Sequence, residues 1–266
     1  MRNLLGRLTA RHAFFLSITI VLFGGFQFLI CAIISTVDVG GAIQELMKSI
    51  PLFMRSTVGE EFFAGFTTWG VLAFGWDHPI AQALGTAVAI VLGTRAIAGK
   101  IESGAMELVL SQPILRTRYL ARQILFALIS LALLSLGGLA GTLCGQVFFQ
   151  IEGSGSGPLL KLGLNFFLLQ CAWYGISLAF SVLGREGGRV ATASFLVALT
   201  SYIVNVIGKL WSKAAFLLPY ALHTYYSPRE ALVENALEGK SVVVLCPVFF
   251  ICIGFAAWRF QWRDIP

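Results

Sequence analysis

The sequence predicts an all-α integral membrane protein with six transmembrane helices, and two observations carry the prediction. Of the 266 residues, 57% are hydrophobic and only 12% are charged, whereas roughly a quarter of the residues in a soluble domain are charged. The apolar residues also form long runs almost free of charge, several of them near the roughly 20 residues that a helix needs to cross a bilayer. Disorder is excluded, because disordered chains combine low hydrophobicity with high net charge.

The predicted spans form one transmembrane domain over residues 1–266. In chain order they cover residues 13–37, 79–98, 124–149, 159–183, 190–211 and 241–260. The basic segment 1–12 carries leucines at helical spacing, which predicts a short interfacial helix before the first span. The first apolar run is about 25 residues long and no small-x-small cleavage site follows it, which favours a retained span over a signal peptide.

Two amphipathic helices are predicted outside the membrane, on the side opposite the termini. Residues 43–50 place apolar side chains at i, i+3, i+4 and i+7, and Pro51 ends the pattern. A second helix is predicted from Ser227–Pro228, in a capping box with Glu230, to Gly239. It places Glu230, Glu234 and Glu238 four residues apart, as a solvated face or as a cation-attracting one.

Residues 62–76 are apolar for about 15 residues, below the roughly 20 that a span needs. They are interpreted as a re-entrant or surface-lying piece, or as an extension of the next span.

The net charge of +6 indicates orientation. Both predicted termini and the loops after spans two and four share one side of the membrane. That side carries twelve cations, namely Arg2, Arg7, Arg11, Arg95, Lys100, Arg116, Arg118, Arg122, Arg185, Arg189, Arg259 and Arg263, and four acids, namely Glu102, Glu107, Glu186 and Asp264. The other side keeps seven cations and nine acids. The positive-inside rule therefore predicts cytoplasmic termini, and no basic cluster has the density of a nucleic-acid-binding stripe.

Small residues and cysteines in the spans are interpreted as packing residues. Gly137, Gly141 and Gly145 repeat at spacing four, which allows close approach of a second helix. The five cysteines lie in or beside apolar runs without metal-ligand spacing, so no metal site is expected.

The loop after span two is the most informative segment. Gly104 breaks the chain, Met106, Val109 and Leu110 form an apolar face at i, i+3 and i+4, and Pro113 ends the pattern. A short amphipathic helix outside the membrane needs a surface to pack on, and either a cytoplasmic partner or the lipid surface meets that need.

The same loop resembles the permease subunits of type-2 ATP-binding-cassette (ABC) exporters. The family's acidic residue, Gly-Thr-Leu-Glu-like step, apolar-Ser-x-Pro turn and arginine are matched by Glu102, Gly104-Ala105-Met106-Glu107-Leu108, Leu110-Ser111-Gln112-Pro113 and Arg116. Residues 259–265 are similar to its closing Phe-x-x-Arg-Asp pattern, and residues 225–228 to its late external loop. The resemblance looks closest to the branch that includes the nitrous-oxide-reductase maturation permease.

The resemblance implies a half-transporter in the cell inner membrane. Two permeases, identical or paralogous, would form the translocation path among membrane lipids and sit on two cytoplasmic ATPase subunits. The loop 100–118 would be the coupling element, with Glu102, Gly104, Met106, Glu107, Leu108, Val109, Leu110, Ser111, Pro113 and Arg116 as its coupling residues. The sequence holds no G-x-x-x-x-G-K-[ST] phosphate loop, so ATP and Mg²⁺ are expected in a partner chain, with no cofactor and no catalysis in this one.

Two other functions stay open from the residues alone. A membrane enzyme acting on lipid needs a convergent polar set, for which Asp77, His78 and His223 are the candidates. A secondary transporter needs polar groups near the midplane, for which Asn165, Gln170 and Asn205 are modest candidates, with Lys209 near a span end. The lack of a charged midplane site favours a lipid-like, peptide or protein-linked cargo, or mechanical work at the outer surface.

Overall fold

The computed structural model describes residues 2–36, 68–151, 153, 155–263, and the side chains from Ala13 onward. Its long helices are α1 (Arg2–Thr36), α6 (Pro79–Ala96), α9 (Arg116–Phe148), α10 (Ser156–Ser181), α11 (Gly187–Leu210) and α13 (Gly239–Trp262). The shorter ones are α5 (Thr68–Asp77), α7 (Ala98–Glu102), α8 (Ala105–Leu110), η1 (Ser212–Tyr220), η2 (Leu222–Tyr225) and α12 (Pro228–Val233). Six helical stretches in the described residues are long and apolar enough to cross a membrane, which confirms the predicted fold class.

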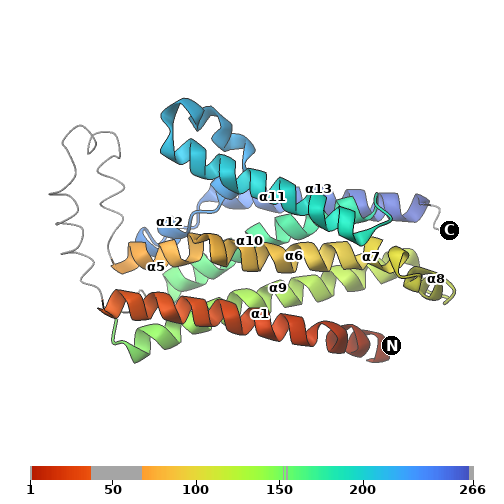
Figure 1. Cartoon of the computed structure of the whole chain (residues 1–266), viewed down its shortest axis with the longest axis horizontal. Helices are drawn as coiled ribbons and strands as arrows, with labels where there is room; N and C mark the ends of the chain where they lie inside the picture. Colours follow the sequence, from red (N-terminus) through yellow and green to blue (C-terminus); the bar gives the residue numbers. More distant parts are fainter. Residues whose placement is uncertain (1, 37–67, 152, 154, 264–266) are drawn as a thin grey trace.

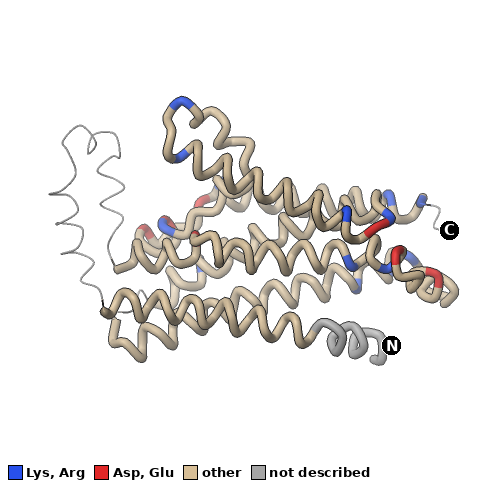
Figure 2. Tube along the Cα trace, in the orientation of Figure 1, with Lys and Arg blue, Asp and Glu red and all other residues tan. Residues whose placement is uncertain are grey.

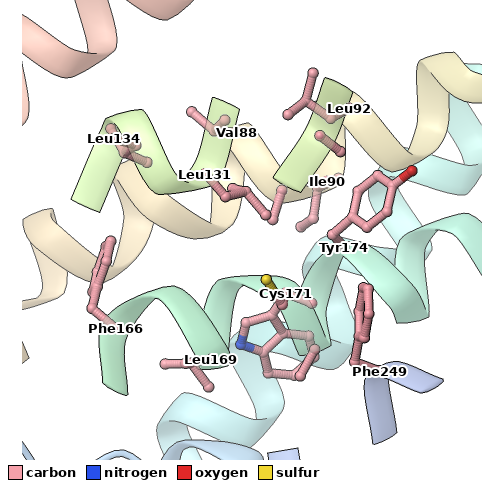
Figure 3. Packing of buried hydrophobic residues seen from close by; sticks show 14 of the residues in the cluster. Val88, Ile90, Leu92, Leu131, Leu134, Phe166, Leu169, Cys171, Tyr174 and Phe249 are labelled. Carbon is pink, nitrogen blue, oxygen red and sulfur yellow. The ribbon is translucent and has the colours of Figure 1, made fainter. Parts of the chain in front are cut away.

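The long helices lie side by side in one elongated bundle (Figure 1). The start of α1 and the end of α13 lie at the same end as α7 and α8, whereas α5 and α12 lie at the opposite end. Helix α10 is central, because it packs against α6, α9, α11 and α13. Figure 3 shows its Phe166, Leu169, Cys171 and Tyr174 among side chains of the neighbouring helices.

Lys, Arg, Asp and Glu residues gather toward the two ends of the bundle and are lacking along the middle of its described helices (Figure 2). This distribution fits a chain that spans a membrane, because charges at mid-bilayer depth are costly. The α7–α8 end is the end on which the sequence places the basic surplus.

Helices α1 and α9 approach each other closely where both carry glycine. A Cβ on Gly24 would lie 2.8 Å from the Gly137 carbonyl oxygen, and one on Gly145 would lie 2.6 Å from Cβ of Cys31. A Cβ on Gly141 would collide with the backbone of Gly24. The predicted close-packing glycines therefore all face the first span.

Helices α6 and α10 are joined by small hydroxyl side chains along their length. Ser181 donates to the Thr94 carbonyl oxygen at 3.0 Å and accepts from the Ala98 amide at 2.8 Å. Ser177 donates to the Ile90 carbonyl oxygen and lies 3.2 Å from the Thr94 hydroxyl. Such bonds hold transmembrane helices together where apolar contacts give little net drive for association.

The second span is longer than predicted and is broken. It begins at Thr68, so residues 68–77 extend the span rather than lie on the surface, while residues 62–67 and the predicted helix over 43–50 lie outside the described residues. The break falls at His78, whose ψ of 140° is extended. Its cause is Pro79, because a proline disfavours the helical conformation in the residue before it.

Two other helix boundaries also differ from the prediction. Helix α1 runs from Arg2 to Thr36 without interruption, so residues 2–12 are helical and continuous with the first span, which begins at Ala13. Residues 10–14 contain neither proline nor glycine, and nothing there stops the helix. Helix α9 begins at Arg116 rather than near residue 124, because its arginines extend the helix past the apolar run.

The segment between α11 and α13 folds back along α11. We call it the external segment, because the charge pattern predicts that it lies on the side of the membrane opposite the termini. Gly208 faces Leu218 of η1, and the Ser201 hydroxyl lies 3.0 Å from Nδ1 of His223 in η2. Helix α12 stops at Val233 instead of reaching Gly239, so the three glutamates do not share one helical face. The predicted capping bond is wrong as well, since the Ser227 hydroxyl bonds Glu238 at 3.3 Å.

Candidate functional site at the α7–α8 connector

The connector is two short helices separated by a glycine turn at the end of the bundle. The amide of Gly104 donates to the Ile101 carbonyl oxygen at 3.0 Å, and Gly104 has φ = +67°. Residues with a side chain rarely adopt this left-handed conformation. The backbone geometry therefore requires a glycine at the position where the sequence predicts a helix breaker. The turn reverses the chain and sets α8 beside α7.

The apolar face of α8 packs on the protein itself. Met106 is 1% exposed and belongs to the hydrophobic core, and Val109 and Leu110 pack partly buried against it. The prediction that this face needs a partner or a lipid surface is therefore wrong, because the bundle already covers it. Glu107 and Leu108 point the other way, and Leu108 is 71% exposed.

The exposed surface continues into the turn that follows α8. Ser111, Pro113 and Leu115 are exposed, and the Ser111 hydroxyl donates to the Leu108 carbonyl oxygen at 3.1 Å. We call the set Glu107, Leu108, Ser111, Pro113 and Leu115 the outer face of the connector. It is short, mixed apolar and polar, and lies on the outside of the bundle end.

Glu102 ties α7 to the start of the fifth span. Its Oε2 accepts a hydrogen bond of 2.8 Å from the backbone amide of Gly187, the first residue of α11. An anionic acceptor at this position also interacts favourably with the partial positive charge of a helix N-terminus. A Cβ on Gly187 would lie 3.2 Å from Cα of Gly99, so the two backbones nearly touch.

Arg116 ties the start of α9 to the end of the sixth span. One of its Nη atoms donates to the carbonyl oxygens of Phe260 and Arg263, at 3.0 and 2.6 Å. The guanidinium also lies over the Phe260 ring, 5.8 Å from its centroid. The last carbonyls of a helix have no partner within it, and Arg116 supplies one to α13.

Arg263 performs the same role for α10. It donates to the carbonyl oxygens of Val182 and Gly184 at 2.6 and 2.9 Å. Burial, together with the positive charges of Arg185 and Arg259, lowers the pKa of this guanidinium from its ordinary value. The connector end of the bundle is thus closed by three side chains, because Glu102 caps α11, Arg116 caps α13 and Arg263 caps α10.

Sequence reasoning found two of these three capping residues. Glu102 and Arg116 stand out by their motif, whereas Arg263 entered only through the closing pattern of the chain. No sequence motif predicts the close approach of Gly99 and Gly187, because that approach depends on which helix ends meet in the fold.

The two histidines considered for an enzyme function have different neighbours. His78 packs against Phe26 and Phe74 of α1 and α5, while His223 packs against Trp173 and Tyr202 of α10 and α11. Across the described part of the chain, no group of three His, Cys, Asp or Glu side chains is arranged to hold a metal ion. Asn165 and Gln170 are buried within α10, and Asn205 accepts from the Thr224 hydroxyl at 3.3 Å.

The six helices of the described residues that are long and apolar enough to cross a membrane define a multi-pass membrane protein. A sequence model of the ABC-2 family transporter proteins matches residues 7–265, nearly the whole chain, and the chain belongs to this family. No curated protein matches the sequence significantly.

Proposed function

We propose that this chain is the membrane subunit of an ABC exporter and that separate cytoplasmic ATPase subunits drive it through the α7–α8 connector. The family supports the transport role, and the basic surplus at the connector end supports a cytoplasmic position for that end. A second permease copy or paralogue completes the translocation path in the cell inner membrane. ATP and Mg²⁺ bind the partner chains and not this one.

The observation that carries the proposal is the contrast between the buried inner face and the exposed outer face of α8. Its inner face is fixed by Met106 in the core, and its outer face presents Leu108 and Glu107 to the surroundings. A helix held on one side and exposed on the other is suited to receive a partner without moving freely against its own bundle.

The capping hydrogen bonds explain how a displacement of the connector is transmitted to the spans. Displacement of α8 moves α7, and α7 holds the N-terminus of α11 through the Glu102 carboxylate. Arg116, just beyond the connector, holds the end of α13. Direct hydrogen bonds therefore attach span five to the connector and span six to the start of α9, which follows the connector. We expect both spans to shift when the ATPases close, as packed elements shift between discrete arrangements.

The test replaces Leu108 by Asp in the full chain, co-expressed with an ABC ATPase subunit from the same genome. We expect the affinity for the ATPase to fall roughly tenfold or more, since truncating a central interface anchor costs about 2 kcal/mol or more. Binding is measured in nanodiscs, and ATP hydrolysis by the assembled complex is measured alongside.

The matched control is Leu160→Asp, which places the same charge at an exposed leucine of α10 at the opposite end of the bundle. It is expected to leave ATPase binding unchanged. Wild-type affinity in Leu108→Asp would contradict the proposal. Met106→Ala separates packing from docking, because it is expected to lower thermal stability first.

The branch that includes the nitrous-oxide-reductase maturation permease is part of the same proposal. Its support is the closing pattern at residues 259–265 and the external Tyr225-Tyr226-Ser227-Pro228.

A further inference from the structure

The break in the second span leaves two backbone carbonyls without helical partners inside the bundle. In a continuous helix, the Gly75 carbonyl would accept from residue 79 and the Trp76 carbonyl from residue 80. Pro79 has no N–H to donate. The amide of Ile80 is engaged elsewhere, because it donates to Nδ1 of its own cap residue His78 at 3.3 Å.

Three side chains supply the missing donors, two from other segments and one from α6 itself. Gln27 of α1 donates to the Gly75 carbonyl oxygen at 3.2 Å. The Trp76 carbonyl oxygen accepts twice, from the Gln82 amide at 2.9 Å and from the Tyr226 hydroxyl at 3.2 Å. Broken helices are tolerated at membrane depth where neighbouring groups satisfy the freed backbone in this way.

These contacts are few for groups so deeply buried. Gln27, Gln82 and Tyr226 are each at least 97% buried, yet the Oε1 atoms of both glutamines have no hydrogen-bond partner in the described structure. Each glutamine is thus oriented at the break through its amide nitrogen. A donor held by one bond is released at lower cost than one fixed in a complete network.

The two halves of the span have different neighbours. Helix α6 is fastened to α10 by the hydroxyl bonds of Ser177 and Ser181. Helix α5 packs mainly on α12 and α1, and α12 begins two residues after Tyr226 in the chain. Tyr226 therefore connects the external segment to the break.

We propose that residues 77–79 are a joint in the second span and that Tyr226, from the external segment, sets its angle together with Gln82. When both donors hold the Trp76 carbonyl, the span is bent. When Tyr226 withdraws, the carbonyl loses one of its two donors and α5 swings relative to α6. The joint links motion of α12 to the span that leads into the connector.

The test measures the angle of the joint in this chain alone, so it stands or falls apart from the proposed ATPase coupling. Spin labels at Thr68→Cys and Ala87→Cys, in a chain whose five native cysteines are replaced, lie about 28 Å apart in a straight helix at 1.5 Å per residue. Pulsed dipolar spectroscopy in nanodiscs gives the distance distribution.

Three variants give distinct expectations. Pro79→Ala restores the N–H and the helical preference of His78, and the distance is expected to lengthen toward the straight-helix value. Tyr226→Phe keeps the ring but removes the donor, and the distribution is expected to broaden. Pro247→Ala is the matched control, because Pro247 lies inside the uninterrupted α13, and it is expected to leave the distribution unchanged.

A Pro79→Ala distance as short as in the wild type overturns the joint, and an unbroadened Tyr226→Phe distribution overturns the role of Tyr226. Should Tyr226→Phe fail to give a monodisperse protein, Gln82→Leu removes the other donor to the same carbonyl. A broadened distribution there supports the joint, and an unchanged one contradicts it.

Discussion

At the residue scale, three charged side chains at the connector end bind backbone groups of helix ends. Glu102, Arg116 and Arg263 each bond peptide groups at a helix end. Hydrogen bonds in which one partner is charged are roughly twice as strong as neutral ones. Such bonds also fix geometry, because the partner is a helix end rather than a flexible side chain.

Substitutions of Glu102 separate the contribution of its hydrogen bond to the Gly187 amide from the contribution of its negative charge. Glu102→Gln keeps an oxygen acceptor for the Gly187 amide but removes the negative charge, and we expect a loss of about 0.3–1 kcal/mol of stability. Glu102→Ala removes the cap altogether and is expected to cost about 0.5–2 kcal/mol. Thermal unfolding in one detergent measures both, and equal stability of Ala and Gln variants would contradict a capping role.

Motifs identify residues well when the partner is close in sequence, and poorly when it is distant. Gly104 was predictable as a breaker because the turn it makes is local. The burial of Met106 was not, because an amphipathic pattern shows that one face is covered without showing what covers it. The bond between Glu102 and Gly187 joins residues 85 positions apart, which a single sequence does not encode locally.

At the element scale, one proline decides the course of the second span. Pro79 divides a stretch of 29 residues that is otherwise helical. Length alone made residues 62–76 look too short for a span, and only their continuity with α6 assigns residues 68–77 to it. Apolar length is thus a poor guide where a break lies inside the membrane.

For the external helix α12 the sequence pattern overestimates the length, because the glutamates keep helical spacing beyond the last residue of the helix. After Val233 the chain turns, and the Ala236 amide donates to the Glu230 carbonyl oxygen at 3.1 Å. Asn235 adopts φ = +47° and is held by Lys161, whose Nζ donates to its carbonyl oxygen at 2.6 Å. The turn brings Glu238 back toward Glu230.

This return makes the external segment sensitive to pH. Burial, a hydrogen bond with Glu238, and the charges of Glu238 and Glu234 raise the pKa of Glu230 to about 7, against the opposing charge of Lys240. The folded carboxyl therefore holds its proton more tightly than the unfolded one. Its contribution to stability is full below the ordinary glutamate pKa and is lost as the pH rises through about 7.

We expect trypsin to cleave at Arg229 and Lys240 faster at pH 8 than at pH 5.5, after correction for the activity of the enzyme. Glu230→Gln stays neutral and is expected to remove this pH dependence. Glu107→Gln, at the opposite end of the bundle, is the control that should retain it. A pH dependence that persists in Glu230→Gln would show that another group is responsible.

At the scale of the whole molecule, the first span depends on backbone contact with the third. Side-chain volume is absent where α1 and α9 cross, because glycines meet on both helices. The repeated glycines of α9 predicted such a crossing. The partner was not predictable, because lipid-facing and helix-facing small residues look alike in a sequence.

Gly24 and Gly25 provide a test within one turn of α1. A Cβ on Gly24 would lie 2.8 Å from the Gly137 carbonyl oxygen, whereas one on Gly25 would meet nothing within 4 Å. Gly24→Ala is expected to destabilise the fold by about 1–3 kcal/mol, as overpacking does. Gly25→Ala is expected to be neutral or slightly stabilising, since it only improves helix propensity. Thermal or denaturant unfolding of the two variants compares them, and equal stabilities would contradict the close crossing.

The cap that Arg263 places on α10 can form only at a late stage of synthesis. Arg263 follows the last span in the chain, while the carbonyls it caps belong to the fourth. When the fourth helix leaves the ribosome, the carbonyl groups of its final turn have no permanent hydrogen-bond partner. They gain one only after two more helices have been inserted. A chain that stops short of residue 263 therefore leaves this helix end open however well its six spans are inserted.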